Sequence, residues 1–302
     1  MSRTRPLIAA LLFALACGDD DAGSPDMAAA SDLGPPPPPT RIGPDAREAR
    51  VTLPNDYDPE ASYPVVMLLH GYGATGLVQG AYFGIPRLAR ELGFIAIIPD
   101  GTADSDGNQF WNATDVCCTL DPSAPDDVAY LSALIDEALA TYAADPDRVT
   151  LIGHSNGGFM AYRMACDASE TIAGLVSLAG ATWNDPAECG DPAEPVSVLQ
   201  IHGTADDTIR YEGGDFRTGT HPSARESVQR FAERSGCAGT WMDRDPIDFV
   251  TTVDGAETKV EVQSTGCAVG TDYQLWTVEG GGHIPSLAEG AIQTALEWLL
   301  AQ

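Results

Sequence analysis

The residues best suited to chemistry in this chain lie in the segment Gly153-His154-Ser155-Asn156-Gly157. An apolar, β-branched run over 149–152 precedes it, and a helix-forming run over 159–166 follows it. Strand, sharp turn and helix form the context in which a G-x-S-x-G serine is raised off a strand end with its hydroxyl exposed. The flanking glycines remove side chains that would block so tight a crossing. We therefore expect Ser155 to be a nucleophile. The alternative is a glycine-rich turn whose serine has no catalytic role.

A serine nucleophile needs a base that takes its proton and an acid that orients the base. One expected strand ends just before Asp206 and Asp207, and the last expected strand ends just before His283. Loops that follow parallel strands share one edge of a sheet, so these side chains should meet Ser155. The sequence predicts a triad of Ser155, His283 and Asp206, with Asp207 as the alternative acid.

The four other histidines (five in the chain, less His283) compete for the role of base. His154 lies inside the turn itself, and His70 and His202 end expected buried strands beside glycines, so we expect these three to be structural. His221 precedes a proline in what the sequence indicates is a polar loop. Only His283 has the chain order and the loop context of a base.

Backbone amides beside Ser155 are suited to stabilise an oxyanion. The amide of Asn156 begins the following helix and has no intrahelical acceptor. The segment His70-Gly71-Tyr72-Gly73 closes the first expected buried strand and is typical of a loop that supplies a second amide. We predict the amides of Tyr72 and Asn156 as the two donors.

Aromatic side chains are concentrated in the loops expected at the catalytic edge. We predict that Tyr72 and Trp111 contact the substrate, whereas the alternative for any single aromatic is that it fills a gap between loop and core. The other candidates for this apolar surface are Tyr82, Phe83, Phe110 and Trp183.

The rest of the chain must position these residues, and it alternates apolar, strand-like runs with helical patterns. Strands are expected at 49–53, 63–70, 94–99, 149–152, 172–178, 196–202, 258–262 and 273–278, and helices at 81–92, 127–143, 159–166, 223–234 and 287–300. The continuously apolar runs are typical of parallel strands covered on both faces. The sequence predicts an α/β domain with a mainly parallel central sheet flanked by helices. The segment 123–126 fits a capping box, so Asp126 and Asp127 are expected to start a helix and not to catalyse.

The chain has 302 residues and a formal net charge of −28, from 16 basic and 44 acidic side chains. This balance argues against nucleic acid and anionic membrane surfaces as partners, and it disfavours polyanionic substrates. Solubility is the simplest interpretation of the acidity. No cysteine or histidine spacing suggests a metal, and no cofactor is expected.

The first 45 residues are expected to lie outside the catalytic domain. Residues 1–17 have two arginines, an apolar run and a small residue before Cys17, which predicts an export signal of lipoprotein type with a lipid anchor on Cys17. Ordinary secretion is the alternative. Residues 18–45 are rich in Asp and Pro and predict a disordered tether, and 46–302 the catalytic domain. The protein is therefore expected outside the cell or on its surface, with a membrane contact only through the anchor.

Without Cys17, six of the seven cysteines remain, and an even number in an exported protein predicts disulfides. Cys237 and Cys267 lie close together late in the chain and are expected to pair. The other four are expected to link the long loop after residue 100, the helix after Ser155 and the segment before residue 196, with the adjacent Cys117 and Cys118 bound to different partners. Those four are Cys117, Cys118, Cys166 and Cys189.

Taken together, these motifs resemble the polyhydroxybutyrate depolymerase-like and feruloyl-esterase-like esterases of the α/β-hydrolases, over roughly residues 47–300. The resemblance rests on His70-Gly71-Tyr72-Gly73, Trp111-Asn112 with Cys117-Cys118, Asp126-Asp127-Val128, Gly153-His154-Ser155-Asn156-Gly157-Gly158, His202-Gly203-Thr204-Ala205-Asp206 and Gly280-Gly281-Gly282-His283. The chain departs from the family pattern at 207–210. The resemblance implies hydrolysis of carboxylic esters by a serine triad, without a metal, in a disulfide-bearing secreted domain. Ser155, Asp206 and His283 fall on its triad positions.

The expected substrates are neutral small-molecule or oligomeric esters. Hydroxybutyrate oligoesters rank slightly above feruloyl or acetyl esters of plant polysaccharide. Two other classes stay open: a serine peptidase or amidase on the same scaffold, and a non-catalytic surface binding protein. An intact triad in the right order disfavours the second of these.

Overall fold

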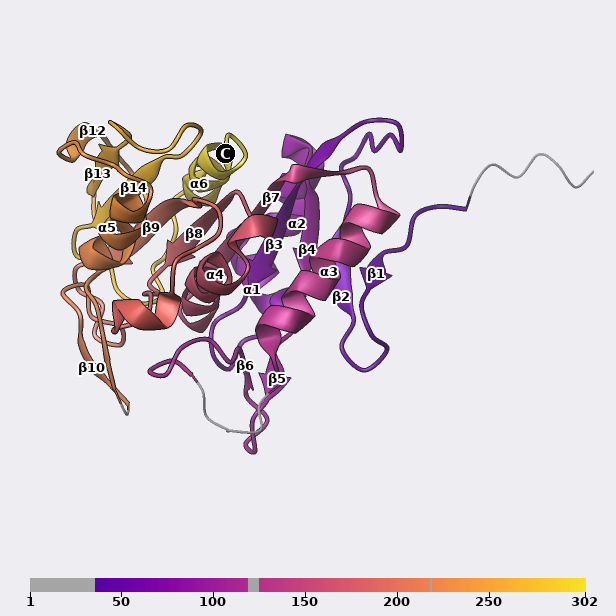
Figure 1. Cartoon of the computed structure of the whole chain (residues 1–302), viewed down its shortest axis with the longest axis horizontal. Coiled ribbons are helices and arrows are strands. Elements are labelled where there is room, and N and C mark those ends of the chain that lie inside the picture. Colours follow the sequence, from indigo (N-terminus) through magenta and orange to yellow (C-terminus); the bar gives the residue numbers. More distant parts are fainter. Residues whose placement is uncertain (1–35, 119–124, 218) are drawn as a thin grey trace, which may run out of the picture. The chain divides into compact units, whose positions relative to one another are not determined.

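A central sheet organises the fold of the computed structural model, which describes residues 36–118, 125–217 and 219–302. Within these residues ten strands pair in the order β1-β2-β4-β3-β7-β8-β9-β14-β13-β12 (Figure 1). The six strands from β4 to β14 are parallel, as predicted, and the outer pairings at both edges are antiparallel. The strands are β1 (Arg41–Ile42), β2 (Ala49–Thr52), β3 (Tyr63–Leu69), β4 (Ile95–Ile98), β7 (Ala144–His154), β8 (Gly174–Leu178), β9 (Ser197–Gly203), β12 (Met242–Ile247), β13 (Thr258–Gln263) and β14 (Tyr273–Val278).

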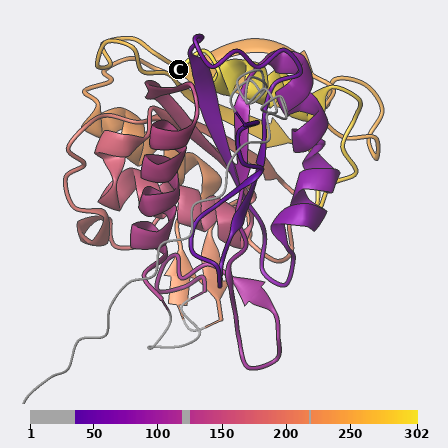
Figure 2. The same ribbon diagram turned by 90° about the vertical axis from the view of Figure 1, so that its right-hand side faces the viewer.

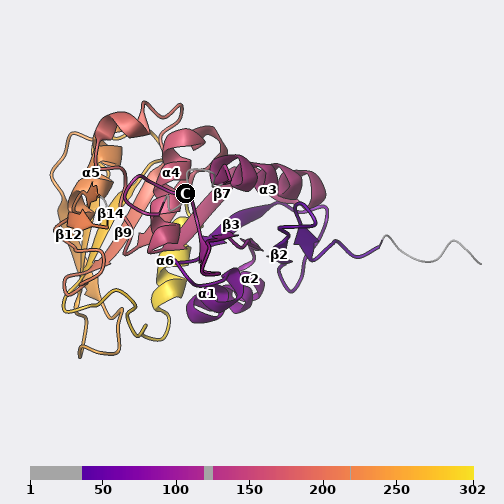
Figure 3. The same cartoon turned by 90° about the horizontal axis from the view of Figure 1, so that it is seen from below.

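Helices cover both faces of this sheet, which is why its central strands are apolar throughout. The helices α3, α4 and α5 lie on one face, and α1, α2 and α6 lie on the other (Figure 3). Figure 2 shows the same two layers from the side, with the sheet between them. The helices are α1 (Gly76–Phe83), α2 (Ile85–Leu92), α3 (Asp127–Thr141), α4 (Asn156–Asp167), α5 (Ala224–Arg234) and α6 (Ala291–Leu299).

The two faces carry separate hydrophobic cores, because successive side chains of a strand point to opposite sides. In β3, Val65, Met67 and Leu69 join the core under α3, α4 and α5. The intervening Val66 and Leu68 join the core under α1, α2 and α6. All five side chains are fully buried. This double burial holds the strand ends, and the loops that follow them, in fixed positions.

Several boundaries differ from the predictions for physical reasons. The helix expected at 81–92 is two helices, α1 and α2, because Gly84 adopts a left-handed conformation with φ 69° and Pro86 lies in the first turn of the second helix. The closing helix begins after the left-handed Gly290 and not at residue 287. The folded unit begins at Pro38, ahead of the expected start, since β1 pairs with β2.

The sequence did not predict the short or solvent-facing strands. The edge strand β12 is mostly exposed and polar, so it lacks the apolar pattern of a core strand. The hairpin of β10 (Gly214–Phe216) and β11 (Gly219–His221) and the pair of β5 (Thr102–Ala103) and β6 (Gln109–Phe110) are too short to carry a pattern. Both of these small sheets lie near the catalytic edge described below.

Three disulfides occur in the described residues, and one pairing corrects a prediction. Cys237 is bound to Cys267, and Cys166 on α4 is bound to Cys189. Cys117 and Cys118 are bound to each other and not to separate partners. The Cα atoms of Cys166 and Cys189 are 4.9 Å apart, an ordinary distance for a disulfide. Because these two cysteines are bound to each other, neither is available as a partner for Cys117 or Cys118.

Candidate active site

The turn between β7 and α4 presents Ser155 at the carboxyl edge of the sheet. Ser155 has φ 53°, an uncommon backbone conformation for a residue other than glycine. Its amide donates to the carbonyl oxygen of Leu178 at 2.8 Å, which ties the turn to the end of β8. A Cβ atom on Gly157 would lie 2.1 Å from the carbonyl oxygen of Leu69, and one on Gly153 would lie 2.1 Å from that of Gly157. The turn therefore needs glycine at both positions.

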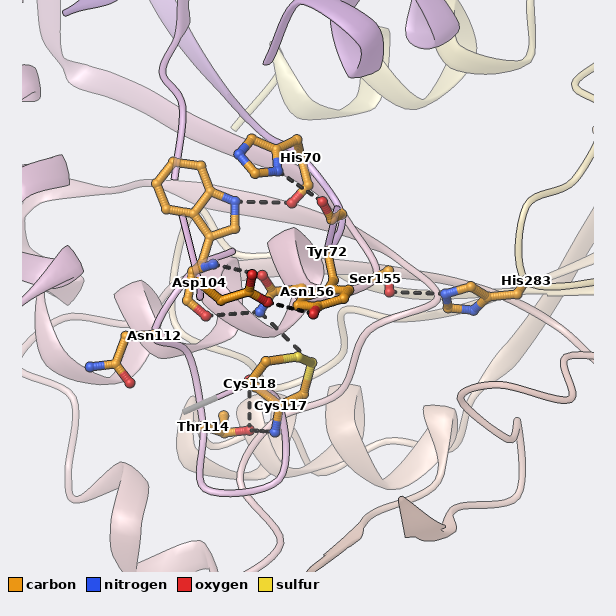
Figure 4. The surroundings of a disulfide bond; sticks show 12 residues. His70, Tyr72, Asp104, Asn112, Thr114, Cys117, Cys118, Ser155, Asn156 and His283 are labelled. Carbon is orange, nitrogen blue, oxygen red and sulfur yellow. Dashed lines mark hydrogen bonds between the residues drawn. A yellow bond between two sulfur atoms is a disulfide. The ribbon is translucent and has the colours of Figure 1, made fainter. Parts of the chain in front are cut away.

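The structure brings Ser155, His283 and Asp206 together in one hydrogen-bonded row. The distance from Ser155 Oγ to His283 Nε2 is 2.9 Å (Figure 4), and that from His283 Nδ1 to Asp206 Oδ2 is 2.8 Å. In this arrangement His283 donates through Nδ1 to the carboxylate and accepts the serine proton at Nε2. The row has the geometry of a nucleophile, a base and an orienting acid.

The carboxylate of Asp206 is buried, and four groups surround it. Its Oδ1 accepts the amides of Thr208 and Ile209, each at 2.9 Å. Its Oδ2 faces His283 and also lies 3.3 Å from Nε2 of His202. Burial alone would raise the pKa of Asp206, but the hydrogen bonds from the two histidines outweigh it and hold that pKa well below its usual value. The carboxylate thus stays ionised beside His283.

The alternative acid, Asp207, is not brought to the base. Its side chain is exposed, and the contact of its carboxylate is with the hydroxyl of the neighbouring Thr208, at 3.4 Å. The acid and base loops are instead joined behind Asp206. The amide of Ala205 donates to the carbonyl oxygen of Gly281 at 2.9 Å, and a Cβ atom on Gly203 would lie 2.1 Å from that same oxygen.

Two of the remaining histidines, His202 and His154, make hydrogen bonds to the loops that carry Asp206 and His283. His202 shares its Nε2 proton between the carbonyl oxygen of Ile209, at 2.7 Å, and Asp206 Oδ2, at 3.3 Å, and it accepts from Gln200 at Nδ1. His154 lies 2.9 Å through Nε2 from the carbonyl oxygen of His283. Burial lowers the pKa of His154 to about 4, so its ring is neutral near pH 7 and donates this hydrogen bond. Both side chains therefore act as structural donors.

Two backbone amides near Ser155 are the predicted oxyanion donors. The Asn156 amide opens α4, and the Tyr72 amide lies in the loop after β3; no acceptor among the described residues takes either proton. Gly73 donates to the carbonyl oxygen of Gln109 at 2.8 Å, which anchors the loop. Both amides are therefore free to donate, as the predicted oxyanion hole requires.

Trp111 is not a substrate contact, which corrects the prediction from sequence. Its side chain is 0% exposed, and its indole N–H donates to the carbonyl oxygen of His70 at 2.9 Å. Its backbone exchanges two hydrogen bonds with the side chain of Asn156, at 2.7 and 3.0 Å. His70 in turn donates through Nδ1 to the Gly71 carbonyl and accepts the Gly101 amide at Nε2. Trp111 thus ties the loop after β3 to the start of α4.

A cavity of 590 Å³ opens beside Ser155 and His283. Its lining includes Tyr72 and Tyr82, whereas Phe83 and Phe110 are buried in the cores and Trp183 lies outside it. Sequence reasoning missed Phe216 and Arg217 because the hairpin that carries them has no recognisable pattern. The lining residues are Gly71, Tyr72, Ala74, Val78, Gln79, Tyr82, Cys117, Cys118, His154, Ser155, Thr208, Phe216, Arg217, His283 and Ile284.

Other candidate residues have structural roles or fall outside the description. Asp126 caps α3 through the amide of Ala129, and Asp127 is paired with Arg47 at 2.7 Å. His221 is buried at the end of β11 and not in a polar loop. Residues 1–17, with the predicted lipid site Cys17, and Ser123 of the predicted capping box lie outside the described residues.

Within the described residues, no group of three or more His, Cys, Asp or Glu side chains has the arrangement of a metal site. No helix in the same part of the chain is long and apolar enough to cross a membrane.

Residues 42–230 match the model of a protein family described as "Putative esterase". The chain belongs to this esterase family. Among curated relatives, a protein of Nocardia uniformis named "Putative esterase NocK" is 29% identical over 73% of this chain and 64% of its own length. Feruloyl esterase D of Neurospora crassa is 26% identical over 82% of this chain and 77% of its own. The match thus spans less than two thirds of the Nocardia esterase.

Solved structures agree on the fold of this esterase. An acetyl xylan esterase from Aspergillus awamori aligns with a TM-score of 0.61 at 17% identity, over 85% of this chain and 94% of its own. Esterase PE8 aligns with a TM-score of 0.53 at 17% identity, over 83% of this chain and 96% of its own. The α/β-hydrolase fold predicted from the sequence is confirmed, and the family identifies the domain as a carboxylic ester hydrolase.

Proposed function

We propose that this esterase hydrolyses its substrates through a covalent acyl-enzyme on Ser155, with His283 as the base and Asp206 as the acid that orients it. The observation that carries the proposal is the unbroken row of hydrogen bonds from Ser155 Oγ through the His283 ring to Asp206, at 2.9 and 2.8 Å. The row lies at a serine with the backbone of a nucleophile elbow and opens into the 590 Å³ cavity.

The reaction proceeds in two halves. Ser155 Oγ attacks the ester carbonyl carbon while His283 Nε2 takes its proton, and the carbonyl oxygen gains negative charge that the amides of Tyr72 and Asn156 stabilise. The tetrahedral intermediate collapses, the bond to the alcohol oxygen breaks, and that oxygen receives the proton from His283. Water then attacks the acyl-serine with the same base, which releases the acid and restores Ser155.

For the acyl group, we propose an aromatic acid of feruloyl type, with acetyl esters of polysaccharide as the alternative. The sequence alone ranks hydroxybutyrate oligoesters first. Two observations support the change: a curated relative that covers 82% of this chain is named a feruloyl esterase, and the cavity has three aromatic side chains, Tyr72, Tyr82 and Phe216, in its lining. Aromatic rings favour stacking on a planar acid.

An exported or surface location also fits. The predicted export signal in residues 1–17 would deliver the chain to an oxidising compartment, where disulfides such as Cys166–Cys189 and Cys237–Cys267 persist.

The proposal is tested by replacing the nucleophile. The Ser155→Ala variant should lose labelling by a fluorophosphonate probe, and its kcat on methyl ferulate and p-nitrophenyl acetate should fall by about 10⁴-fold or more, since triad members act as a unit. Ser62→Ala, an exposed serine just before β3, is the matched control and should behave as wild type. Labelling of Ser155→Ala at the wild-type level would exclude Ser155 as the nucleophile.

The same preparation decides the acyl group and the reaction class. A kcat/KM on methyl ferulate at least tenfold above that on hydroxybutyrate trimer supports the aromatic acid, and the reverse ratio restores the hydroxybutyrate ranking. Faster cleavage of the matching anilides would indicate an amidase, and an unlabelled, inactive wild type would indicate a binding protein.

A further inference from the structure

The charge of the active-site cavity is opposite to that of the whole chain. Acidic residues outnumber basic ones by 44 to 16 in the sequence. Among the described residues that line the cavity, however, there is no carboxylate, and Arg217 is the one side chain with a permanent charge. The acid of the triad, Asp206, is buried behind His283 and does not contribute to this lining.

Aromatic rings hold the Arg217 guanidinium at the cavity wall. Its central carbon lies 4.9 Å from the centre of the Tyr72 ring and 5.6 Å from that of Phe216. The Tyr72 ring is itself fixed, because its hydroxyl donates to Asp104 at 2.6 Å and accepts from Asn108 at 3.3 Å. An arginine that packs through its face keeps its N–H donors at the edge, in the plane of the group.

Of the other four arginines that lie over aromatic rings in the described residues, three also have a carboxylate, whereas Arg234 over Phe231 has none within 4 Å and donates to the carbonyl oxygen of Pro186. Arg47 lies over Tyr130 and is paired with Asp127, and Arg225 lies over Trp241 and is paired with Glu261. Arg163 lies over Trp183 and is paired with Asp167. Within the described residues, no carboxylate lies within 4 Å of the Arg217 guanidinium. Arg217 therefore lies over aromatic rings, as Arg47, Arg163 and Arg225 do, but it lacks the carboxylate partner that those three arginines have within the described residues.

We propose that Arg217 is a substrate-binding residue and that its missing anionic partner is a carboxylate carried by the ester. This inference rests on the proposed ester hydrolysis at Ser155 and adds a substrate class to it: esters with a free carboxylate a few bonds from the scissile group. A planar guanidinium donates two parallel hydrogen bonds to a carboxylate, which fixes the orientation of the substrate as well as adding attraction.

The net charge of −28 does not oppose this local preference at physiological salt. The Debye length there is about 8 Å, so carboxylates elsewhere on the surface are largely screened from the cavity. Arg217 acts at contact distance, where screening is weakest. The Arg217 side chain is exposed, so its ion pair with a substrate carboxylate is partly screened by water. We therefore expect it to favour the acid over the matching neutral amide by roughly fivefold in kcat/KM.

The experiment compares acids with neutral amides of the same size, with the carboxylate placed on either side of the ester. On the alcohol side, the acetyl ester of glycolate is compared with the acetyl ester of glycolamide. On the acyl side, monoethyl glutarate is compared with ethyl glutaramate. The kcat/KM of each is measured at 0.15 M salt for wild type, Arg217→Gln, Arg217→Lys and Arg244→Gln. Arg244 is an exposed arginine on the edge strand β12. The Arg244→Gln substitution therefore removes the same positive charge at a position outside the cavity.

In at least one pair, wild type and Arg244→Gln should prefer the acid about fivefold, mainly through KM, because a remote group binds ground and transition states alike. Arg217→Gln should bring the acid-to-amide ratio to about one, and Arg217→Lys should retain part of the preference. A ratio in both pairs that is the same for Arg217→Gln as for wild type would overturn the assignment. Turnover of the neutral amides tests ester hydrolysis separately, so failure of that activity is distinguishable from failure of this inference.

Discussion

The two sides of Ser155 are built on different principles. On the proposed acid–base side, side chains supply the reacting groups: His283 is held by the carboxylate of Asp206, which itself faces a second histidine, His202. On the proposed oxyanion side, backbone amides supply these groups, and the side chains of Trp111 and Asn156 hold the loops in place. One side depends on residue type at a few positions, and the other depends on where the main chain lies.

This difference decides how each side responds to substitution. A change of Asp206 or His283 removes a functional group from the proposed reaction. A change of the Asn156 or Trp111 side chain leaves the backbone amides of Tyr72 and Asn156 in place and only shifts their positions. The loss of kcat should therefore be smaller. The predictions that follow test this ordering.

Asp206→Asn should have the largest effect. An asparagine amide can donate to Nδ1 of His283 and so favours the tautomer that cannot accept the serine proton, which typically costs about 10³–10⁴-fold in kcat. Asp207→Asn is the matched control, since Asp207 is exposed and does not contact the base, and it should change kcat by less than about threefold. Steady-state kinetics on p-nitrophenyl acetate measure both. The reverse order of damage would reassign the acid.

His154 should make the stability of the fold depend on pH. Its folded-state pKa is lowered to about 4 by burial, from 6.5, so below pH 6.5 the unfolded chain binds a proton that the folded chain does not. Stability should therefore fall as the pH drops from 6.5 towards 4, by about 3 kcal/mol in all. Stability at higher pH is independent of this group.

The matched comparison is His154→Gln, measured by urea unfolding at pH 7.5, 5.5 and 4.2. Burial also lowers the pKa of His70 and His221, but these residues are present in both proteins and cancel in the difference. The gap in unfolding free energy between wild type and variant should shrink towards low pH. A gap that is constant with pH would mean that the His154 ring is not buried in its neutral form, and the support behind His283 would need another explanation.

The contrast between the two sides also explains what could be predicted from the sequence. Ser155, Asp206 and His283 have diagnostic side chains at the ends of apolar strands, so the sequence placed them at one edge. Any residue can supply an amide, so the support given by Trp111 and by the Asn156 side chain left no signal. The aromatic type of Trp111 even suggested a substrate contact.

The same limit applies to the fold. The parallel core was predictable because strands covered on both faces, such as β3, are apolar throughout. The edge strand β12 is polar and depends on pairing with β13, which is a tertiary contact. The hairpin that carries Phe216 and Arg217 is three residues to a strand, too short for a periodic pattern, and so the cation of the cavity was not foreseen.

Asn156→Ala should have the smallest effect. The variant keeps the Asn156 amide but loses both hydrogen bonds to the Trp111 backbone, which leaves a buried N–H group without a partner at a typical cost of 1–3 kcal/mol in stability. Trp111 also holds the His70 carbonyl, so the loop of Tyr72 loosens and kcat should fall about tenfold, less than for removal of an oxyanion donor outright.

Asn184→Ala, at an exposed asparagine away from the cavity, is the control for this substitution. Fluorophosphonate labelling of Asn156→Ala should persist at a reduced rate, because Ser155 and His283 are untouched. A loss of kcat as large as that of Asp206→Asn, in a variant that is still folded, would remove the distinction between the two sides. It would mean that the Asn156 side chain itself reaches the reacting atoms.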